Sequence, residues 1–187
     1  GPDWFVETTG NDTIATGSID SPFASIQSAI NFATTDGDSV AVAAGTYVEN
    51  INFRRRNIKV LGQGRETTII DGDSSGSVVT FDSGEDATAL LSGFTIQNGS
   101  GRPSSPPGYT DGGGIYCLSS SPSLRNLIVK NNTASWGGGI YSSGSNPTLE
   151  RIEISNNLVD VDGGGLNIND SSSPSLINVN IYNNSAS

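Results

Sequence analysis

Three successive stretches of the chain share nearly the same sequence, and this repetition limits the fold more than any other feature. The copies begin at Gly112, Gly137 and Gly163, so they follow one another after 25 and then 26 residues. They read GGGIYCLSSSPSLRNLIVKNN, GGGIYSSGSNPTLERIEISNN and GGGLNINDSSSPSLINVNIYNN. A period of about 20 to 30 residues with short alternating apolar runs and no helix is typical of a β-solenoid, in which each copy is one turn.

Equivalent apolar residues of the copies are expected to form columns inside the coil, because a single turn cannot bury its own apolar face. The expected columns are Ile115, Ile140 and Leu166, and Leu124, Leu149 and Leu176. A weaker copy, LSGFTIQN at residues 91–98, precedes them. We also predict an internal ladder of side-chain amides at a bend of each turn, formed by Asn131, Asn156 and Asn183.

The first part of the chain contains an amphipathic segment, SPFASIQSAINFA, with helix-start signals. Ser21 is suited to the N-cap and Pro22 to the first helical position, which predicts a helix near residues 22–34. Its expected apolar face contains Phe23, Ile26, Ile30 and Ala33. Because an open solenoid end exposes apolar interior and strand edges, we expect this helix to cap the coil.

We predict one domain over residues 3–187, all-β and parallel apart from the short capping helix. Its expected parts are the cap at 3–38, the first coils at 39–98, an inserted loop at 99–111 and the regular repeats at 112–187. Residues 1–2 match the remnant of a cleaved purification tag. The last copy stops where another would continue, so we expect a fragment of a longer protein.

Composition excludes several classes of function. The chain has no histidine, so it supplies neither a Ser-His-Asp triad nor a histidine metal ligand. The single cysteine, Cys117, is expected to be a buried small hydrophobe. Nine basic and nineteen acidic side chains give a net charge of -10, which argues against nucleic-acid binding. We expect no membrane insertion, because no stretch has the apolar length of a membrane span.

Two kinds of motif resemble known families. The segments PFASIQSAI and GTYVENI resemble the N-terminal cap and first coils of the pectin-lyase-like superfamily of right-handed parallel β-helices. The copies of NN-x-A-x-x-GGGIY are similar to repeats of autotransporter passengers and polymorphic outer-membrane proteins. The resemblance implies a right-handed parallel β-helix in a secreted or surface-attached bacterial protein, and therefore an extracellular or cell-surface location.

The superfamily contains enzymes as well as adhesins, and the resemblance implies which residues an enzyme would need. A methylesterase-like site would pair two aspartates with an arginine in motifs of the DFIFG and LGRPW types, and a polygalacturonase-like site would need histidine; the sequence matches neither. A lyase would need a basic residue. None of the basic residues of the repeat half matches a lyase motif: Arg102, Arg125, Lys130 and Arg151. We therefore predict no catalytic residue in this segment.

Two outward columns are candidates for ligand binding. Asp111, Trp136 and Asp162 precede the three glycine triplets, and Tyr116, Tyr141 and Asn167 follow the inward residue of each first strand. Exposed aromatic rings with neighbouring carboxylates and amides suit a sugar-binding surface. The alternative is a ladder whose stacking only stabilises neighbouring coils.

The insertion GSGRPSSPPGYTD, at residues 99–111, is expected to project beside these columns and to bring Arg102 and Tyr109 over them. The alternative is a tolerated surface loop. We expect no cofactor. The alternative is calcium at Asp160 and Asp162, together with Asp111, although Trp136 interrupts that column.

We predict an extracellular binding or adhesion scaffold, non-catalytic in this segment, with a polysaccharide or cell-surface glycan as its partner. One alternative is a polysaccharide lyase or glycoside hydrolase with an unfamiliar active site. Another is a structural spacer or filament subunit that associates end to end through an open C-terminal coil.

Overall fold

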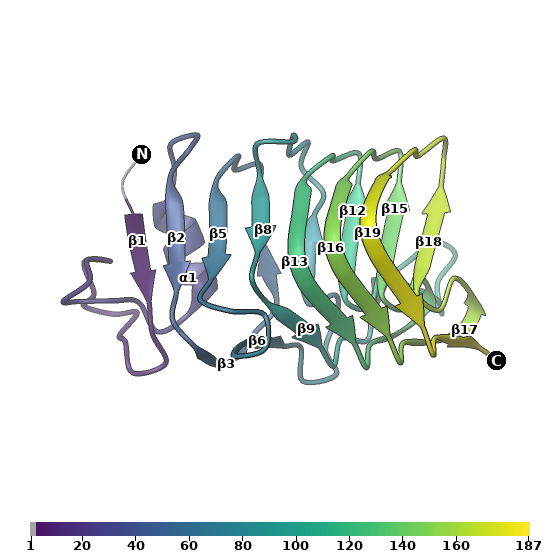
Figure 1. Cartoon of the computed structure of the whole chain (residues 1–187), viewed down its shortest axis with the longest axis horizontal. Helices are drawn as coiled ribbons and strands as arrows, with labels where there is room; N and C mark the ends of the chain where they lie inside the picture. The colour runs from purple at the N-terminus through teal and green to yellow at the C-terminus, as the bar shows by residue number, and fades with distance from the viewer. Residues whose placement is uncertain (1–2) are drawn as a thin grey trace.

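Strands of successive repeat copies pair in parallel and in register, so the chain winds into a parallel β-helix (Figure 1). The structure, a computed structural model, describes residues 3–187, and the expected tag remnant at residues 1–2 lies outside them. These residues form three sheets along the coil. The all-β parallel fold predicted from the repeats is confirmed.

Sheet 1 is the longest and runs from the N-terminal to the C-terminal end of the coil. Its strands are β1 (Asp3–Val6), β2 (Ser39–Val42), β3 (Gly45–Val48), β5 (Lys59–Gly62), β6 (Thr68–Asp71), β8 (Leu90–Ser92), β9 (Thr95–Gln97), β13 (Ser123–Lys130), β16 (Thr148–Ser155) and β19 (Ser175–Tyr182).

Two shorter sheets form the other sides of the later turns. Sheet 2 contains β4 (Ile51–Asn52), β7 (Val79–Phe81), β12 (Ile115–Leu118), β15 (Ile140–Ser143) and β18 (Leu166–Asn169). Sheet 3 contains β10 (Arg102–Pro103), β11 (Thr110–Asp111), β14 (Thr133–Trp136), β17 (Leu158–Asp162) and β20 (Ser185–Ala186).

The interior is built from the predicted apolar columns. Ile115 pairs with Ile140 and Ile140 with Leu166 in sheet 2, and Leu124, Leu149 and Leu176 align in sheet 1. The weaker copy continues them, with Leu91 beside Leu124. Cys117 is fully buried, as predicted, and burial raises the pKa of its thiol.

The predicted asparagine ladder is present but displaced by one residue. Asn132, Asn157 and Asn184 form it, with side-chain amide-to-oxygen distances of 3.0 and 2.9 Å between successive coils. The residues predicted to form it, Asn131, Asn156 and Asn183, have positive φ values of 56°, 55° and 53° and are exposed. The prediction was wrong because this left-handed conformation turns the first asparagine of each pair outward and the second inward.

The capping helix is shorter than predicted. Helix α1 spans Ile26–Phe32, and its N-cap is Ser25, not Ser21. Pro22 and Phe23 are extended instead, because Phe23 N–H donates to Phe5 O at 2.9 Å and so runs beside β1. The predicted apolar face is correct, since all four of its residues are fully buried: Phe23, Ile26, Ile30 and Ala33.

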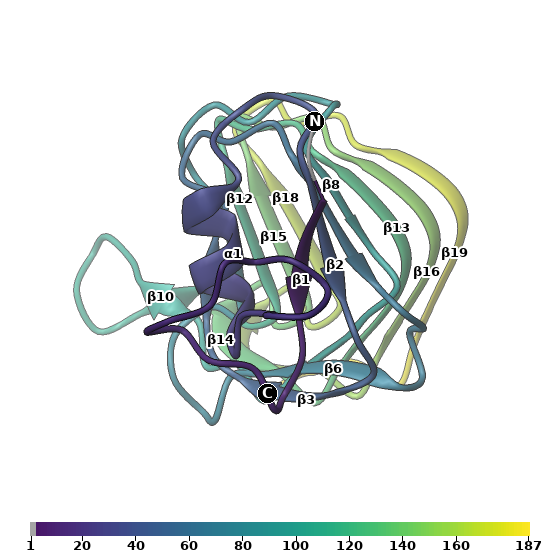
Figure 2. The same cartoon turned by 90° about the vertical axis from the view of Figure 1, so that its left-hand side faces the viewer.

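Helix α1 lies beside the first strands at the N-terminal end of the coil (Figure 2). The Glu49 carboxylate holds its start, accepting hydrogen bonds from the main-chain N–H groups of Ile26 at 2.8 Å and Gln27 at 2.9 Å. This contact supplies acceptors for two N–H groups that have no partner within a helix.

The inserted loop at 99–111 contains a short antiparallel hairpin, in which β10 pairs with β11. Figure 2 shows this hairpin projecting from one side of the coil. At the other end of the molecule, β19 pairs with β16 and with no other strand of residues 3–187, and Leu176 and Ile181 of β19 are 45% and 46% exposed. Within residues 3–187, no helix has the length and apolar character needed to cross a membrane.

Candidate functional site

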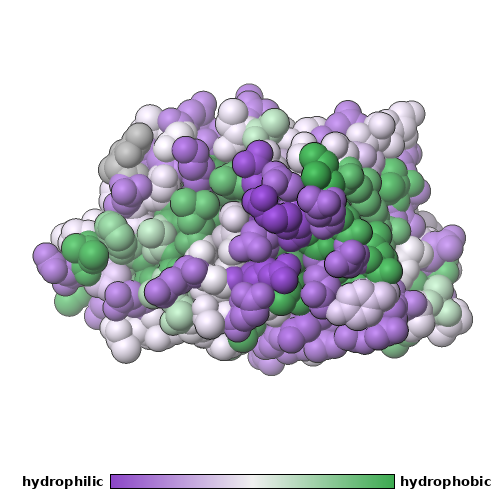
Figure 3. All heavy atoms as spheres, viewed as in Figure 1, coloured by the Kyte–Doolittle hydropathy of each residue, from purple (hydrophilic) through white to green (hydrophobic). Residues whose placement is uncertain are grey.

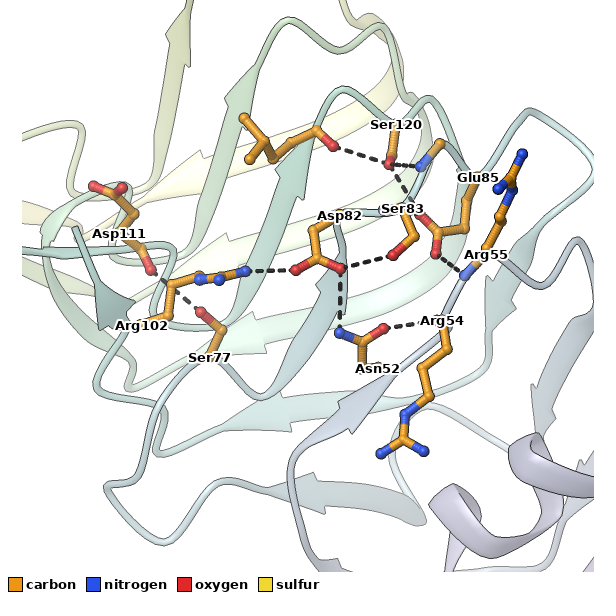
Figure 4. Close-up of polar contacts among 12 residues, drawn as sticks. Asn52, Arg54, Arg55, Ser77, Asp82, Ser83, Glu85, Arg102, Asp111 and Ser120 are labelled. Atoms are coloured by element: carbon orange, nitrogen blue, oxygen red, sulfur yellow. Dashed lines mark hydrogen bonds and ion pairs between the residues drawn. The ribbon is translucent and has the colours of Figure 1, made fainter. Parts of the chain in front are cut away.

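The side chain of Arg102 joins the hairpin to sheet 2 (Figure 4). Its Nη1 donates to Asp82 Oδ2 at 2.7 Å, and its Cζ lies 4.7 Å from the ring centroid of Tyr116. Asp82 follows β7, and Tyr116 lies on β12, so one guanidinium group contacts two neighbouring strands. An arginine over an aromatic face is attracted by the ring as well as by the carboxylate.

Both predicted outward columns exist in the strand register. Asp111 pairs with Trp136 and Trp136 with Asp162 in sheet 3. In sheet 2 the column runs from Tyr116 through Tyr141 to Asn167, and the two tyrosine rings stack with centroids 5.4 Å apart and an interplanar angle of 4°.

The expectation that both columns face outward was wrong for two residues, Tyr116 and Asp111, of which Asp111 is 7% exposed. Tyr116 is only 6% exposed, because the hairpin lays the Arg102 side chain over its ring. Tyr141 is partly exposed, so it presents more of its ring surface to solvent than Tyr116 does.

The hairpin also brings an aromatic ring to the first column. The ring of Tyr109 packs against that of Trp136, with centroids 4.7 Å apart and an interplanar angle of 37°. Tyr109 is 39% exposed. The insertion therefore adds one aromatic and one cationic side chain to the columns, as the sequence predicted for Tyr109 and Arg102.

Asp82 belongs to this cluster but was not among the predicted site residues. It also accepts a hydrogen bond from Asn52 Nδ2 at 3.2 Å. Burial alone would raise the pKa of Asp82, but the hydrogen bonds from Arg102 and Asn52 outweigh burial, and its pKa lies below the usual value. Asp82 stands in TFDSG, outside the clear repeats, where an aspartate is expected for turn chemistry alone. The only signal in the sequence that could have indicated a site is the position of Asp82 directly after a strand.

The pKa of Asp111 is shifted in the opposite direction from that of Asp82. Asp111 is 7% exposed, and among the described residues no group donates a hydrogen bond to its Oδ1. Burial raises the pKa of Asp111, and the nearby Ser104 hydroxyl and Arg102 charge reduce this effect without reversing it. Figure 4 shows its carboxylate on the side of Arg102 away from Asp82.

The remaining predicted residues form no metal cluster. Asp160 and Asp162 are exposed on β17, and residues 3–187 contain no group of three or more acidic or cysteine side chains placed to hold a metal ion. Asp111 is separated from Asp162 by Trp136 in the register. Calcium binding at Asp160 and Asp162 stays the alternative to the expectation that the chain has no cofactor.

The arrangement offers two kinds of chemistry. The rings of Tyr109, Trp136 and Tyr141 provide flat apolar surface beside polar groups, which suits the faces and hydroxyls of sugars. Asp82 and Asp111, with pKa values moved in opposite directions on either side of Arg102, are a candidate base and a candidate acid.

Comparison with known proteins supports the fold. The chain is similar to the solved structure of pectin methylesterase from carrot, with a TM-score of 0.54 and 17% identity over 84% of this chain and 53% of that one. It is also similar to a mutant pectin methylesterase in complex with a hexasaccharide, with a TM-score of 0.55 and 14% identity over 97% of this chain and 66% of that one.

The chain thus spans from about half to just under two thirds of the length of these structures. At such low identity the likeness shows the fold alone, and the predicted right-handed parallel β-helix fold is confirmed. No protein-family model matches the chain, and no curated protein matches its sequence.

Proposed function

We propose that this chain binds a polysaccharide at the face formed by the hairpin and the two outward columns. The observation that carries the proposal is the packing of Tyr109 on Trp136, beside the stacked rings of Tyr116 and Tyr141. A ladder that only stabilised the coils would need no aromatic residue from an insertion. The hairpin supplies one, and Tyr109 stays partly exposed.

Two further observations support a sugar ligand. Polar acceptors lie beside the rings, as sugar recognition requires: Asp111 in one column and Asn167 in the other. A protein of similar fold has been solved with a hexasaccharide. We propose that the protein acts outside the cell or at a bacterial cell surface, as an adhesin or secreted binding protein. The alternative of a structural spacer that associates end to end is tested separately by light scattering. Growth of the particles with protein concentration would support it.

The binding proposal is tested on a glycan array followed by calorimetry with the best ligand. Trp136→Ala removes the ring that faces Tyr109, so we expect affinity to fall at least about tenfold, the scale of one lost aromatic contact. Tyr182→Ala is the matched control, because Tyr182 is an exposed aromatic residue on sheet 1. Equal loss in both variants, or no binding by the wild-type protein, would contradict the proposal.

A second candidate function is hydrolysis of a polysaccharide or its ester groups. Two aspartates whose pKa values are shifted in opposite directions favour it, because acid–base hydrolysis uses two carboxyl groups in different environments. Two aspartates and an arginine are also the residue types that the family resemblance implied for a methylesterase, although the expected motifs are absent.

Hydrolysis is tested by incubating the protein with a panel of acidic, neutral and esterified polysaccharides. New reducing ends, unsaturated uronates and released alcohol are measured, which separates hydrolase, lyase and esterase chemistry. We expect Asp111→Asn to abolish any product while Trp136→Ala reduces product only through weaker binding. Bound polysaccharide without any product would support a module that binds only.

A further inference from the structure

We infer that this face selects polysaccharides without negative charge, and that Asp111 and Asn167 accept hydrogen bonds from their hydroxyl groups. The inference rests on the proposed function and specifies its ligand class.

The polar atoms left without partners on this face are acceptors. Asp111 Oδ1 and Asn167 Oδ1 are buried, and within the described residues neither receives a hydrogen bond. Asp111 neighbours Trp136, and Asn167 neighbours Tyr141 in the strand register. A buried acceptor without a donor is destabilising, and a sugar hydroxyl would supply the donor. A carboxylate or sulfate group has no proton to donate, so only the hydroxyl groups of a polysaccharide can pair with these acceptors, and a charged substituent at that position would leave them unpaired.

The cation that lies on this face is already neutralised. Arg102 forms its ion pair with Asp82 at 2.7 Å and covers Tyr116, so an anionic ligand would have to compete with a carboxylate for it. The other cations of the repeat half belong to β13 and β16 of sheet 1: Arg125, Lys130 and Arg151. Figure 3 views the side of sheet 1, where hydrophilic residues gather over the middle of the molecule.

Further negative charge lies along the same column. Asp162 pairs with Trp136, and Asp160 stands on the same strand, both exposed. The chain as a whole carries a net charge of -10. A polyanion would therefore be repelled by these charges as it approaches the columns. The tyrosine hydroxyls of the second column do not alter this preference, because a phenol can donate or accept.

The test compares polymers that share a backbone and differ in charge. Three pairs are used in affinity gel electrophoresis: hydroxyethylcellulose and carboxymethylcellulose, dextran and dextran sulfate, and esterified and de-esterified pectin. In the pair that binds, we expect the neutral polymer to bind at least about tenfold tighter at about 0.01 M salt, where charges act over about 30 Å. The difference should narrow at about 0.15 M salt, where the Debye length is about 8 Å.

Two sets of variants separate the charge and hydrogen-bond parts of the inference. Asp162→Asn removes an exposed charge beside Trp136, so binding of the anionic polymer should rise about threefold at low salt. Asp36→Asn, an exposed change in the N-terminal region, should leave this binding unchanged.

Asp111→Ala removes the buried acceptor and should weaken neutral-polymer binding at least about tenfold. Asp111→Asn keeps an acceptor oxygen and should retain most of this binding. Circular dichroism and the thermal midpoint report whether each variant folds.

Tighter binding of the anionic member of a pair would overturn the inference and leave the proposed function standing. Unchanged neutral-polymer binding in folded Asp111→Ala would overturn the role of Asp111 as a hydroxyl acceptor. Binding to no polymer of any pair would contradict the proposed function itself, and this inference with it.

Discussion

Asn132 donates a hydrogen bond from its side-chain amide to the side-chain oxygen of Asn157 in the next coil, at 3.0 Å. Asn157 is 1% exposed and continues the ladder to Asn184. Its Nδ2 also donates to the main-chain oxygen of Val129 at 3.1 Å. The ladder thus satisfies buried polar groups of three successive coils.

Replacement of Asn157 by Ala should lower the free energy of unfolding by about 2 to 4 kcal/mol, because several buried hydrogen bonds are lost and their partners stay unpaired. The adjacent Asn156→Gly is the control. Asn156 is exposed with a φ of 55°, which glycine adopts without strain, so this change should lie within about 0.5 kcal/mol of wild type. Urea denaturation measures both. Equal effects would mean that the ladder adds no stability.

Gly139→Ala should be destabilising by about 1 to 3 kcal/mol, because an added Cβ would lie 2.4 Å from the main-chain oxygen of Gly165 in the next coil. The contact is with backbone, so it cannot be relieved by a side-chain rotation. Gly64→Ala meets only the hydroxyl of Thr67 at 3.0 Å and should be nearly neutral. Thermal midpoints compare the two. A tolerated Gly139→Ala would show that successive coils can separate there.

Tyr47→Phe should change how stability depends on alkaline pH. The Tyr47 hydroxyl donates to the main-chain oxygen of Ala43 at 3.0 Å. Burial, followed by the charges of Glu7 and Glu49, raises the pKa of Tyr47 from 10.0 to about 12. The folded state therefore holds this proton more tightly than the unfolded state, and the resulting stability is present below pH 10 and lost as pH rises toward 12.

At pH 7 the wild-type protein should be about 1 kcal/mol more stable than Tyr47→Phe, the usual value of one hydrogen bond. This advantage should disappear between pH 10 and about 12, as the raised pKa requires. Urea unfolding at a series of pH values measures the difference in the free energy of unfolding between the two proteins. The other tyrosines are present in both proteins, so their titration cancels in this difference. A constant difference across this range would show that Tyr47 titrates at the same pH in both states.

Arg102→Met should loosen the hairpin. It removes the ion pair with Asp82 and the contact with Tyr116, and we expect a loss of about 1 kcal/mol, since the arginine side chain is 40% exposed and partly screened by solvent. Arg125→Met is the control, because Arg125 pairs with Glu150 at 3.3 Å on an exposed face and should contribute less than about 0.5 kcal/mol.

Limited proteolysis gives an independent readout of the hairpin. Cleavage within residues 103–109 should be faster in Arg102→Met than in wild type or Arg125→Met, because a loop released from the coil is a better protease substrate. Equal cleavage rates in the three proteins would mean that other contacts hold the hairpin in place.

Much of the candidate site could be predicted because it lies on the repeat. The alignment of Trp136 with Asp111 and Asp162 required only that equivalent residues of neighbouring turns stack in register. Asp82 could not be found in this way. It precedes the clear repeats and meets Arg102 only because the hairpin folds back over sheet 2. The burial of Tyr116 depends on the same fold-back.

The sequence by itself determined the coil, its apolar columns and the residues of the helix that are buried. The spacing of apolar residues and their repetition from copy to copy decide which side chains lie in the interior. Only the tertiary structure decided which asparagine of each pair turns inward, where α1 begins, and what Arg102 contacts. These features depend on positive φ values at the bends, on the pairing of Phe23 with β1 and on the path of an insertion. The start of α1 and the contacts of Arg102 follow from pairing between segments distant in the chain, which no local pattern encodes, and the choice of asparagine follows from the backbone conformation at each bend.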